Sequence, residues 1–359
     1  MNSRTQTAPA LLLCLAALLA AAGCGSDLKP DAPGVDGSTL FPIVVQLDWV
    51  AEPEHGAFYT AEALGYFTAE GLDVTLHQGG ANANVLEKVA TNRANFGQWD
   101  STNSMVAIQE GLPIINIAAV FQHDPSVLML HESNPVEGFA DLDGQLIKAR
   151  PEWAFLPFLR RTYGIDFRIV PHDFGLELLV ADKTMIQQGY FIAEPYHASK
   201  QGARLRWLHV WDAGYDNCNT LIANRAFITE HPQQTRAFLR AYYRGYREYM
   251  EGDPQPAHRL MQEVNDQVTP AFLSWSRLMI REQKLDRGDP ARGGPGEYLV
   301  LTSQRMQDQI TMLEQLDILE PGKLTASDVM TDEFLPWKLM DPVTASTDEE
   351  ADNDAGAGE

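Results

Sequence analysis

Hydrophobic and polar positions alternate along the chain between short apolar runs and stretches with helical spacing. Runs rich in Val, Ile and Leu predict strands at 42–47, 71–76, 94–97, 114–120 and 127–130. Between them, 56–67 and 82–92 have apolar residues spaced to share one helix face, and Ser101 is expected to cap the next helix. Strands that alternate with helices predict an α/β fold.

A second, shorter alternation begins after residues 131–145, where Pro135, Gly138 and Gly144 interrupt the pattern. The elements expected after this break are a strand from 145–149, a helix over 153–163, and strands at 167–170, 189–192, 207–211 and 221–223. From Pro232 the pattern is mainly helical, with a Gly/Pro-rich loop at 287–296. We therefore expect two lobes: lobe I from 40–130 plus 220–340, and lobe II from 131–219. Bilobed chains of this kind bind ligand between the lobes and close by hinge bending.

The N-terminus has the features of an export signal. Arg4 precedes an apolar run from Ala8 to Ala22, which is too short for a stable membrane span. The run ends in Ala-Ala-Gly-Cys at 21–24, which resembles a bacterial lipobox. This resemblance implies a signal peptide over 1–23 and a lipoprotein whose Cys24 carries diacylglycerol and palmitate. Residues 24–39, rich in Gly, Pro, Ser and Asp, would form a flexible tether to the membrane. The alternative is an ordinary signal peptide cut at a small-residue site.

Composition excludes several classes of function. The net charge of −22 argues against nucleic acid or an anionic membrane face as a partner. Part of this charge lies in residues 341–359, which we expect to be a disordered acidic tail. With Cys14 removed and Cys24 acylated, Cys218 stands alone, so no disulfide is expected. The sequence has neither an HExxH motif nor an Asp-x-Asp-x-Asp-Gly loop, and we expect neither a metal nor a cofactor.

The most specific block of sequence is LDWVAEPEHGAFYTA at 47–61, followed by Gly-Tyr-Phe at 65–67 and Glu-Gly-Leu-Asp-Val at 70–74. Weaker agreement follows at 141–144, 194–196 and 228–232. This pattern resembles the thiamine-pyrimidine-precursor binding and synthase superfamily, which includes aliphatic-sulfonate-binding proteins. The resemblance implies a type 2 periplasmic-binding-protein fold. It also implies a monomeric, extracytoplasmic or periplasmic substrate-binding protein that delivers a small molecule to the permease of an ABC transporter.

The superfamily also contains an enzyme, the pyrimidine synthase. The enzyme carries a pyridoxal phosphate lysine where this chain has Trp99, and a cysteine-rich cluster where residues 215–220 contain only Cys218. Together with the export signal, these differences favour transport, and we expect the protein not to be an enzyme. The expected ligand is a small heteroaromatic such as a thiamine pyrimidine precursor. Riboflavin, a sulfonate or another nitrogen heterocycle is an alternative, as is a ligand-sensing subunit of a membrane receptor.

Candidate ligand-binding residues follow from what a planar ligand requires. Trp49, Tyr59 and Trp99 lie at or near strand ends and could stack on a ring, or serve as core aromatics. His55 could bind the ring edge or cap a helix. Asp100 and Ser101 open a helix, where free N–H groups and hydroxyls could donate to polar ligand atoms. In the resemblance, Glu194 matches a position facing the cleft, where a carboxylate would accept from an aminopyrimidine. Its alternative is a surface charge.

Two further groups complete the expected picture. Tyr215, Asp216 and Asn217 lie near the expected return to lobe I and are weaker candidates for the pocket. The helix over 233–250 carries Tyr242, Tyr243, Tyr246 and Tyr249 at helical spacing, which predicts a core stripe. Cys218 is expected to be a small buried side chain.

Overall fold

The computed structural model describes residues 39–288 and 296–336. The strands are β1 Phe41–Gln46, β2 Leu72–His77, β3 Phe96–Asp100, β4 Ile114–Phe121, β5 Ser126–His131, β6 Leu146–Ala149, β7 Arg168–Pro171, β8 Ile186–Tyr190, β9 Leu205–His209 and β10 Asn219–Asn224. The helices are α1 Gly56–Ala63, α2 Tyr66–Ala69, α3 Val85–Ala90, α4 Ser101–Gln109, α5 Phe155–Tyr163, α6 Glu177–Ala181, α7 Glu194–Lys200, α8 Arg225–Glu230, α9 Pro232–Glu251, α10 Gln255–Val264, α11 Pro270–Glu282, α12 Ser303–Gln315 and α13 Ala326–Val329. Short 3₁₀ helices are η1 Pro53–His55, η2 Phe139–Leu142 and η3 Val210–Ala213.

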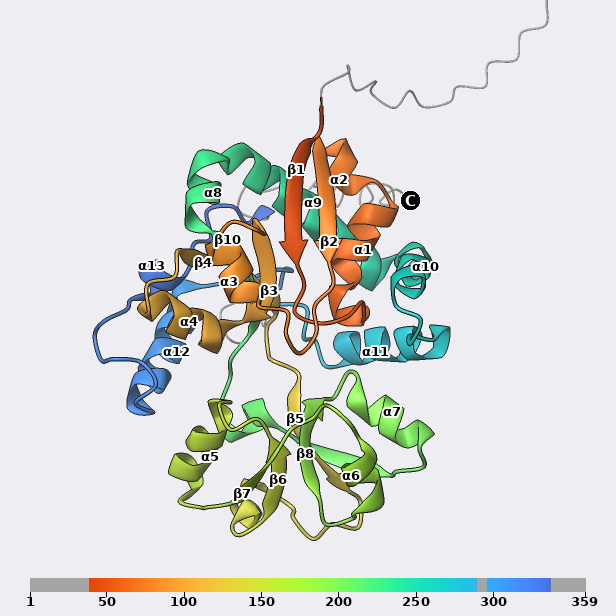
Figure 1. Cartoon of the computed structure of the whole chain (residues 1–359), viewed down its shortest axis with the longest axis vertical. Coiled ribbons are helices and arrows are strands. Elements are labelled where there is room, and N and C mark those ends of the chain that lie inside the picture. Colours follow the sequence, from red (N-terminus) through yellow and green to blue (C-terminus); the bar gives the residue numbers. More distant parts are fainter. Residues whose placement is uncertain (1–38, 289–295, 337–359) are drawn as a thin grey trace, which may run out of the picture. The chain divides into compact units, whose positions relative to one another are not determined.

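The first sheet has the order β2-β1-β3-β10-β4 (Figure 1). Strand β1 pairs in parallel with β2 and β3, whereas β10 runs antiparallel between β3 and β4. Because β1, β2 and β3 are parallel, their carboxyl ends meet at one edge of the sheet. Ligands bind in open α/β sheets at this kind of edge.

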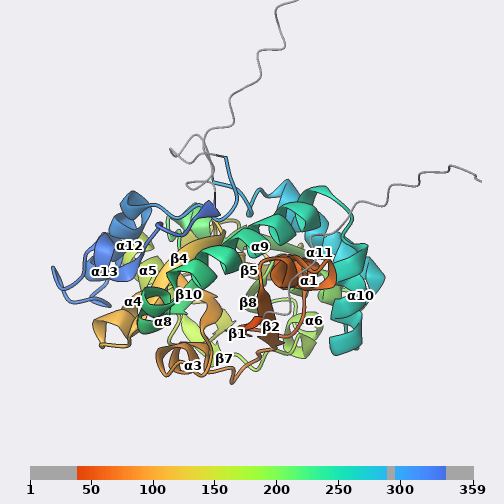
Figure 2. The same ribbon diagram turned by 90° about the horizontal axis from the view of Figure 1, so that it is seen from above.

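The side-chain alternation of these strands divides the core of the first sheet between its two faces. Phe96 of β3 packs on one face, with helices α1 and α9. On the opposite face, Ile222 of β10 packs with Val85 and Val89 of α3. Figure 2 shows α3 on the side of the sheet opposite to α1 and α9. Helices therefore cover both faces of the sheet, and a ligand can reach it only at the carboxyl ends of its strands.

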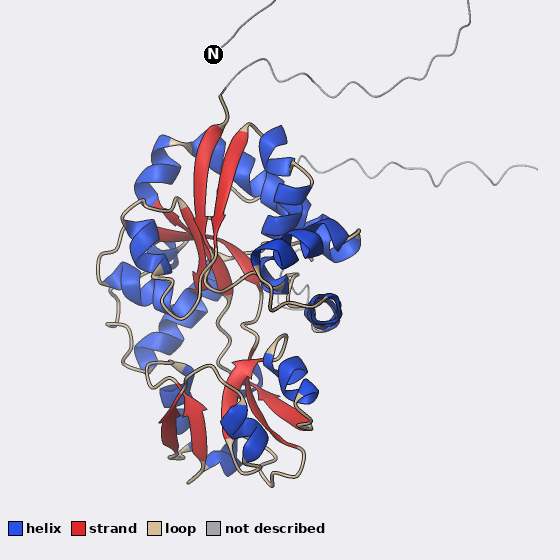
Figure 3. Cartoon of the chain, turned by 45° about the vertical axis from the view of Figure 1, so that its right-hand side comes forward, coloured by secondary structure: helices blue, strands red, loops and turns tan. Residues whose placement is uncertain are grey.

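The second sheet has the order β7-β6-β8-β5-β9. Strands β6, β7 and β8 are parallel, and β5 is antiparallel to both β8 and β9. Its strands lie apart from those of the first sheet, with helices alongside (Figure 3). A separate apolar cluster, including Leu128, Ile147, Leu156 and Ile186, holds it together. The described residues therefore form two lobes, each with a sheet and a core.

Two crossings of the chain join the lobes. The first runs from β4 to β5 through Gln122–Pro125, and the second returns from β9 through η3 to β10. Strand β5 lies entirely in the second sheet, so lobe II includes 126–130, which the sequence assigned to lobe I. The pattern alone did not locate this boundary because β4 and β5 are both continuously apolar and separated by only a few residues.

Most expected elements are present, with local differences. The helix expected over 56–67 is broken into α1 and α2 at Gly65, whose φ of 67° is left-handed. The N-cap of α4 is Asp100, not Ser101, because the Asp100 carboxylate accepts from the Asn103 N–H. The strand expected at 189–192 is β8, which ends at Tyr190.

The tyrosine stripe of α9 and Cys218 are buried, as predicted. No helix among the described residues is long and apolar enough to cross a membrane. The expected signal peptide, Cys24, the tether and the acidic tail all lie outside the described residues.

Candidate functional site

Two aromatic side chains from opposite lobes meet at the carboxyl edge of the first sheet. Trp49 follows β1 in lobe I, and Phe174 follows β7 in lobe II. Their ring centroids are 5.2 Å apart, with the planes tilted by 42°. Trp49 is half-buried and Phe174 is 38% exposed, so ring surface on both remains accessible. The pair therefore spans the space between the lobes.

The loop that carries Phe174 is held by specific contacts. Phe174 has a φ of 64°, which is uncommon for a residue with a side chain, and its N–H donates to His172 Nδ1 over 2.8 Å. Buried Lys148 donates to the Gly175 carbonyl at 2.9 Å and forms an ion pair with Asp173. These hydrogen bonds fix the backbone of residues 172–175, and the loop therefore holds Phe174 against Trp49.

The segment between Trp49 and α1 carries a group of carboxylates around one histidine. His55 is fully buried, with Nε2 2.8 Å from Asp48 Oδ1 and 3.5 Å from Glu54 Oε1. Burial and the neighbouring carboxylates Asp48 and Glu52 raise the pKa of Glu54 well above its usual value. The pKa of Glu52 is raised to about 8 by burial, and also by Glu194 and Asp48. Glu52 and Glu54 therefore both resist ionisation at neutral pH.

Lobe II and the first crossing contribute more acidic groups. Glu194 opens α7 and accepts from the Tyr190 N–H at 2.7 Å, while burial raises its pKa. Asp124 lies in the first crossing and accepts from the Tyr190 hydroxyl at 3.1 Å. Burial raises the pKa of Asp124 to about 6, against the hydrogen bonds from Ser126. Carboxylates from both lobes and from the crossing thus face the same region.

A cavity of about 90 Å³ lies between Asp100 and Asp124. Thr102, Tyr190, Tyr215 and Asn217 also contribute to its wall, with Trp153 and Gln188 from lobe II. Tyr215 is buried, and its hydroxyl lies 2.8 Å from Thr102 Oγ1. This cavity can hold a small polar group of a ligand, or water, next to the carboxyls of Asp100 and Asp124.

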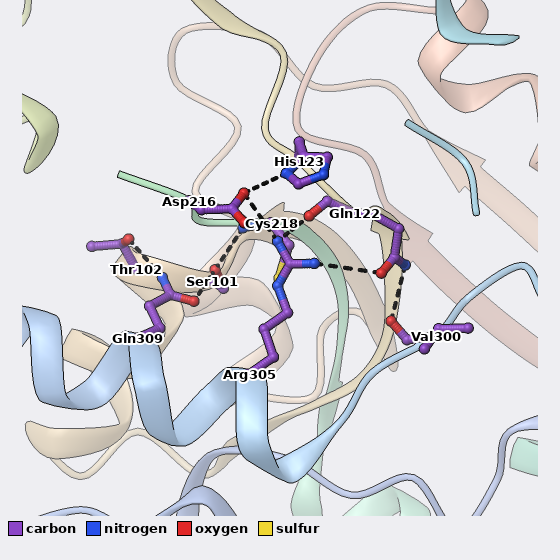
Figure 4. Close-up of polar contacts among 9 residues, drawn as sticks. All are labelled: Ser101, Thr102, Gln122, His123, Asp216, Cys218, Val300, Arg305 and Gln309. Atoms are coloured by element: carbon purple, nitrogen blue, oxygen red, sulfur yellow. Dashed lines mark hydrogen bonds and ion pairs between the residues drawn. The ribbon is translucent and has the colours of Figure 1, made fainter. Parts of the chain in front are cut away.

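A larger cavity of about 340 Å³ borders the two crossings and α12. Its wall includes Asp216, whose Oδ1 is 2.5 Å from His123 Nδ1 and 3.3 Å from Arg305 Nη2 (Figure 4). Arg305 also donates to the Gln122 carbonyl. His123 and Asp216 belong to different crossings, so Arg305 of α12 ties both hinge segments together.

The structure places the ten predicted site residues in six different surroundings. Trp49 and Glu194 face the interlobe region, and Asp100, Tyr215 and Asn217 line the smaller cavity. His55 is turned to Asp48, and Tyr59 is 3% exposed in the lobe I core, which raises its pKa to about 12. Ser101 and Asp216 point toward α12 instead. Trp99 packs against the α3 side of the sheet, with its indole N–H buried and unpartnered among the described residues.

Sequence reasoning missed several groups that the structure brings to the same region. Glu52 and Glu54 lie within the specific block at 47–61 but were not predicted as site residues. Two acids close to a tryptophan that follows a strand were a signal that could have identified them. Asp124, Tyr190 and Phe174 had no such signal, because only the packing of lobe II against the crossings brings them together.

One group among the described residues has the composition of a metal site. Ligand atoms of Asp48, Glu54 and His55 lie within 4.8 Å of one another. A metal ion there would have to replace the hydrogen bond between His55 and Asp48. The cluster therefore has the donor atoms for a cation, with histidine and carboxylate as the ligand types.

The chain is similar to known proteins in both sequence and structure. Residues 52–257 match the family described as NMT1/THI5 like. The riboflavin-binding protein RibY of Chloroflexus aurantiacus is 25% identical over 68% of this chain and 72% of its own length. The formylaminopyrimidine-binding protein of Halalkalibacterium halodurans is 25% identical over 85% of this chain and 93% of its own. Fungal 4-amino-5-hydroxymethyl-2-methylpyrimidine phosphate synthases match 58–60% of the chain at 23–26% identity.

Among solved structures, the periplasmic aliphatic sulphonate binding protein SsuA from Escherichia coli superposes with a TM-score of 0.62. The match covers 82% of this chain and 92% of that one at 11% identity, which indicates a shared fold. The two-lobe α/β fold of periplasmic binding proteins, expected from the sequence, is therefore confirmed. Since the family match spans more than half of the 359 residues, the chain belongs to the NMT1/THI5-like family.

Proposed function

We propose that this protein is the substrate-binding component of an ABC importer and that it holds a planar heteroaromatic ligand between its lobes. The observation that carries the proposal is the meeting of Trp49 and Phe174 across the two lobes. A ring that enters between these side chains would stack on aromatic faces from both lobes. Stacking of this kind contributes about 1–3 kcal/mol per ring, so ligand binding and lobe closure would reinforce each other.

Two relatives named for different ligands support a ring-binding cleft. One is named for riboflavin and the other for formylaminopyrimidine, and both molecules are nitrogen heterocycles. The sulphonate-binding neighbour shares the fold but only 11% of the sequence. An anion such as a sulfonate is disfavoured here, because no lysine, arginine or histidine lines the smaller cavity in the described structure to pair with its charge.

The pyrimidine synthase is the competing function within the family. Two features of this chain disfavour it. Trp99 stands where we align the cofactor lysine, and its ring packs against the apolar cluster beside α3. Cys218 is fully buried, and burial raises the pKa of its thiol, which suppresses the thiolate that a metal would require. Absence of activity in the presence of pyridoxal phosphate and iron would be consistent with a binding protein.

We also propose that Cys24 is acylated and tethers the domain to the outer face of a membrane, where an ABC permease would receive the ligand. Acyl chains bind membranes with about 0.8 kcal/mol per buried CH₂, which is ample for a soluble domain. Labelling of cells with a palmitate analogue, compared between wild type and Cys24→Ala, tests the anchor independently of the ligand.

The ligand class is tested on the chain from residue 26 onward, unfolded and refolded to remove carried-over ligand. Thermal unfolding is followed with hydroxymethyl- and formylamino-pyrimidines, riboflavin, alkanesulfonates and nitrate. A ligand at 100 times its dissociation constant stabilises the protein by about 2.7 kcal/mol, a shift of several degrees.

Two variants in the cleft and one matched control make the result specific. Trp49→Ala and Glu194→Gln should lose most of the shift, whereas Trp207→Ala, on edge strand β9, should keep it. A shift with heterocycles that survives Trp49→Ala would place the ligand elsewhere. A shift only with sulfonates or nitrate would contradict the proposed ligand class.

A further inference from the structure

Three side chains near the start of α1 have metal-ligating atoms at the spacing of a shared ion. His55 Nε2 is 2.8 Å from Asp48 Oδ1 and 3.5 Å from Glu54 Oε1, and the ligand atoms of all three lie within 4.8 Å of one another. Ligands at 2.0–2.2 Å from a tetrahedral zinc ion lie about 3.3–3.6 Å apart. The His55–Glu54 spacing already fits this geometry, and Asp48 reaches it with a shift of roughly half an ångström.

Burial distinguishes this cluster from a chance group of surface acids. His55 is 0% exposed and Glu54 is 7% exposed, so water is largely excluded from both. The Asp48 side chain is 13% exposed, which gives a small ion a way in. His55 is the one basic side chain among the described residues that forms an ion pair with either acid. No lysine or arginine of the described chain therefore takes the place of a bound cation.

An independent observation comes from the start of β10. Asn219 is 1% exposed, and its Nδ2 lies 3.4 Å from Asp48 Oδ2. Its Oδ1 is buried and has no hydrogen-bond partner in the part of the chain that the structure describes. A half-turn of this amide about its Cβ–Cγ bond puts Oδ1 in the place of Nδ2, facing Asp48. The side chain then adds a carbonyl oxygen to the cluster, and the unpaired acceptor gains a partner.

A neighbouring amide on the same face of the sheet is also unpaired. Gln98 is 0% exposed, and neither its Oε1 nor its Nε2 has a partner among the described residues. In the antiparallel pairing of β3 with β10, Asp100 is opposite Asn219 and Gln98 is opposite Leu221. The Gln98 and Asn219 side chains therefore share one face of the sheet as diagonal neighbours. Unpaired buried polar atoms that gather in this way indicate a bound ion or water.

We propose that Asp48, Glu54, His55 and Asn219 bind one divalent transition-metal ion, with Zn²⁺ as the preferred ion. One imidazole nitrogen and three oxygens suit Zn²⁺, whereas Ca²⁺ and Mg²⁺ take six or more oxygen ligands. Four protein ligands complete a tetrahedral shell, which is the pattern of a structural zinc site.

The bound ion connects three parts of lobe I. Its ligands come from the segment after β1, from η1 and from the start of β10. The ion therefore holds the segment that carries Trp49 against β10, at the carboxyl edge of the first sheet. No short motif marks the site in the sequence, because Asp48 is seven residues from His55 and 171 residues from Asn219.

Metal binding is tested on the chain from residue 26 onward, which keeps every described residue and lacks Cys14 and Cys24. The protein is unfolded in EDTA, refolded in metal-free buffer and titrated calorimetrically with Zn²⁺, Mn²⁺, Ca²⁺ and Mg²⁺. Thermal unfolding measures the stabilisation that each ion gives. Co²⁺ provides a spectroscopic probe, because its visible absorption is strong only when the ion is four-coordinate.

Two ligand variants and one control make the result specific. Asp48→Asn removes a charged ligand but keeps a side chain that can bond to His55. It should weaken Zn²⁺ binding by about 100-fold or more, since changes outside the ligand set already weaken metal binding by about 10–100-fold. Asn219→Leu fills a similar volume without an oxygen and should weaken binding by roughly tenfold. Glu110→Gln removes an exposed acid at the end of α4 and should change nothing.

We expect one Zn²⁺ to bind per chain, at least about tenfold more tightly than Ca²⁺ or Mg²⁺. At about 100 times its dissociation constant, Zn²⁺ should raise the melting temperature by several degrees. Wild type without saturable Zn²⁺ binding would overturn the inference, as would binding that both ligand variants leave unchanged. If Asp48→Asn does not fold, Asn219→Leu and the Co²⁺ spectrum of wild type decide the question. None of these outcomes involves the heterocyclic ligand, so a negative result leaves the proposed function standing.

Discussion

Replacing Glu52 by Gln should make the ligand-free protein less sensitive to alkaline pH. A folded-state pKa of about 8, against an ordinary 4.5, means that the folded protein holds this proton more tightly than the unfolded chain. At about 1.4 kcal/mol per pKa unit, the difference corresponds to about 5 kcal/mol. Because the pKa of Glu52 is raised in the folded protein, its bound proton stabilises the fold. This stabilisation is fully present below pH 4.5, falls as pH rises, and is gone above pH 8.

Thermal unfolding of the ligand-free chain between pH 4.5 and 8.5 measures this effect. At about 2 °C per kcal/mol, wild type should lose roughly 10 °C more than Glu52→Gln over this range. Because the other acids of the chain also respond to pH, Glu110→Gln provides the reference slope. A slope for Glu52→Gln equal to that of the reference would refute the reasoning, since it would mean that Glu52 ionises freely in the folded protein.

Three further substitutions test other parts of the structure. Gly79→Ala should destabilise the protein by about 1–3 kcal/mol in urea unfolding and weaken ligand binding, because the new Cβ would lie 2.3 Å from the backbone of Asp48; unchanged values would contradict that close approach. Tyr242→Phe should be neutral or stabilise by about 1 kcal/mol, because the Tyr242 hydroxyl is buried and has no hydrogen-bond partner within residues 39–288 and 296–336; a loss above 1 kcal/mol would contradict this reasoning. Asp216→Asn should weaken the ion pairs of Asp216 with Arg305 and His123 and increase protease cleavage at the crossings. Asp212→Asn is the control, and equal cleavage of the two variants would argue against a hinge role for Asp216.

The lobe I elements were predictable because each carries its own local signal. The apolar run before Trp49 predicts a buried strand, and the spacing of Phe58 and Ala61 predicts a helix face, without reference to the rest of the chain. The α9 tyrosines were predictable for the same reason, since helical spacing alone places Tyr242, Tyr246 and Tyr249 on one side. Register and strand order are different, because they depend on which strands pair.

The candidate site was only partly accessible from sequence. Trp49 was identified because it ends a strand within a specific motif, and Glu194 because it matched a family position. Phe174 could not be identified, because its loop reads as a polar turn and its role depends on Lys148 holding the Gly175 carbonyl from the next strand. Ser101 was assigned to the ligand, yet its hydroxyl is engaged by Gln309, which is distant in sequence.

What the sequence by itself determined is therefore the class of fold, the family and the position of Trp49 just after a strand, all of which arise from short, contiguous patterns. Tertiary structure alone decided the electrostatics of the site. Glu52, Asp124 and Glu194 are ordinary acids in a chain with a net charge of −22. They become a group with raised pKa values only where the two lobes bring them together and exclude water, because burial and like charge act through space and not along the chain.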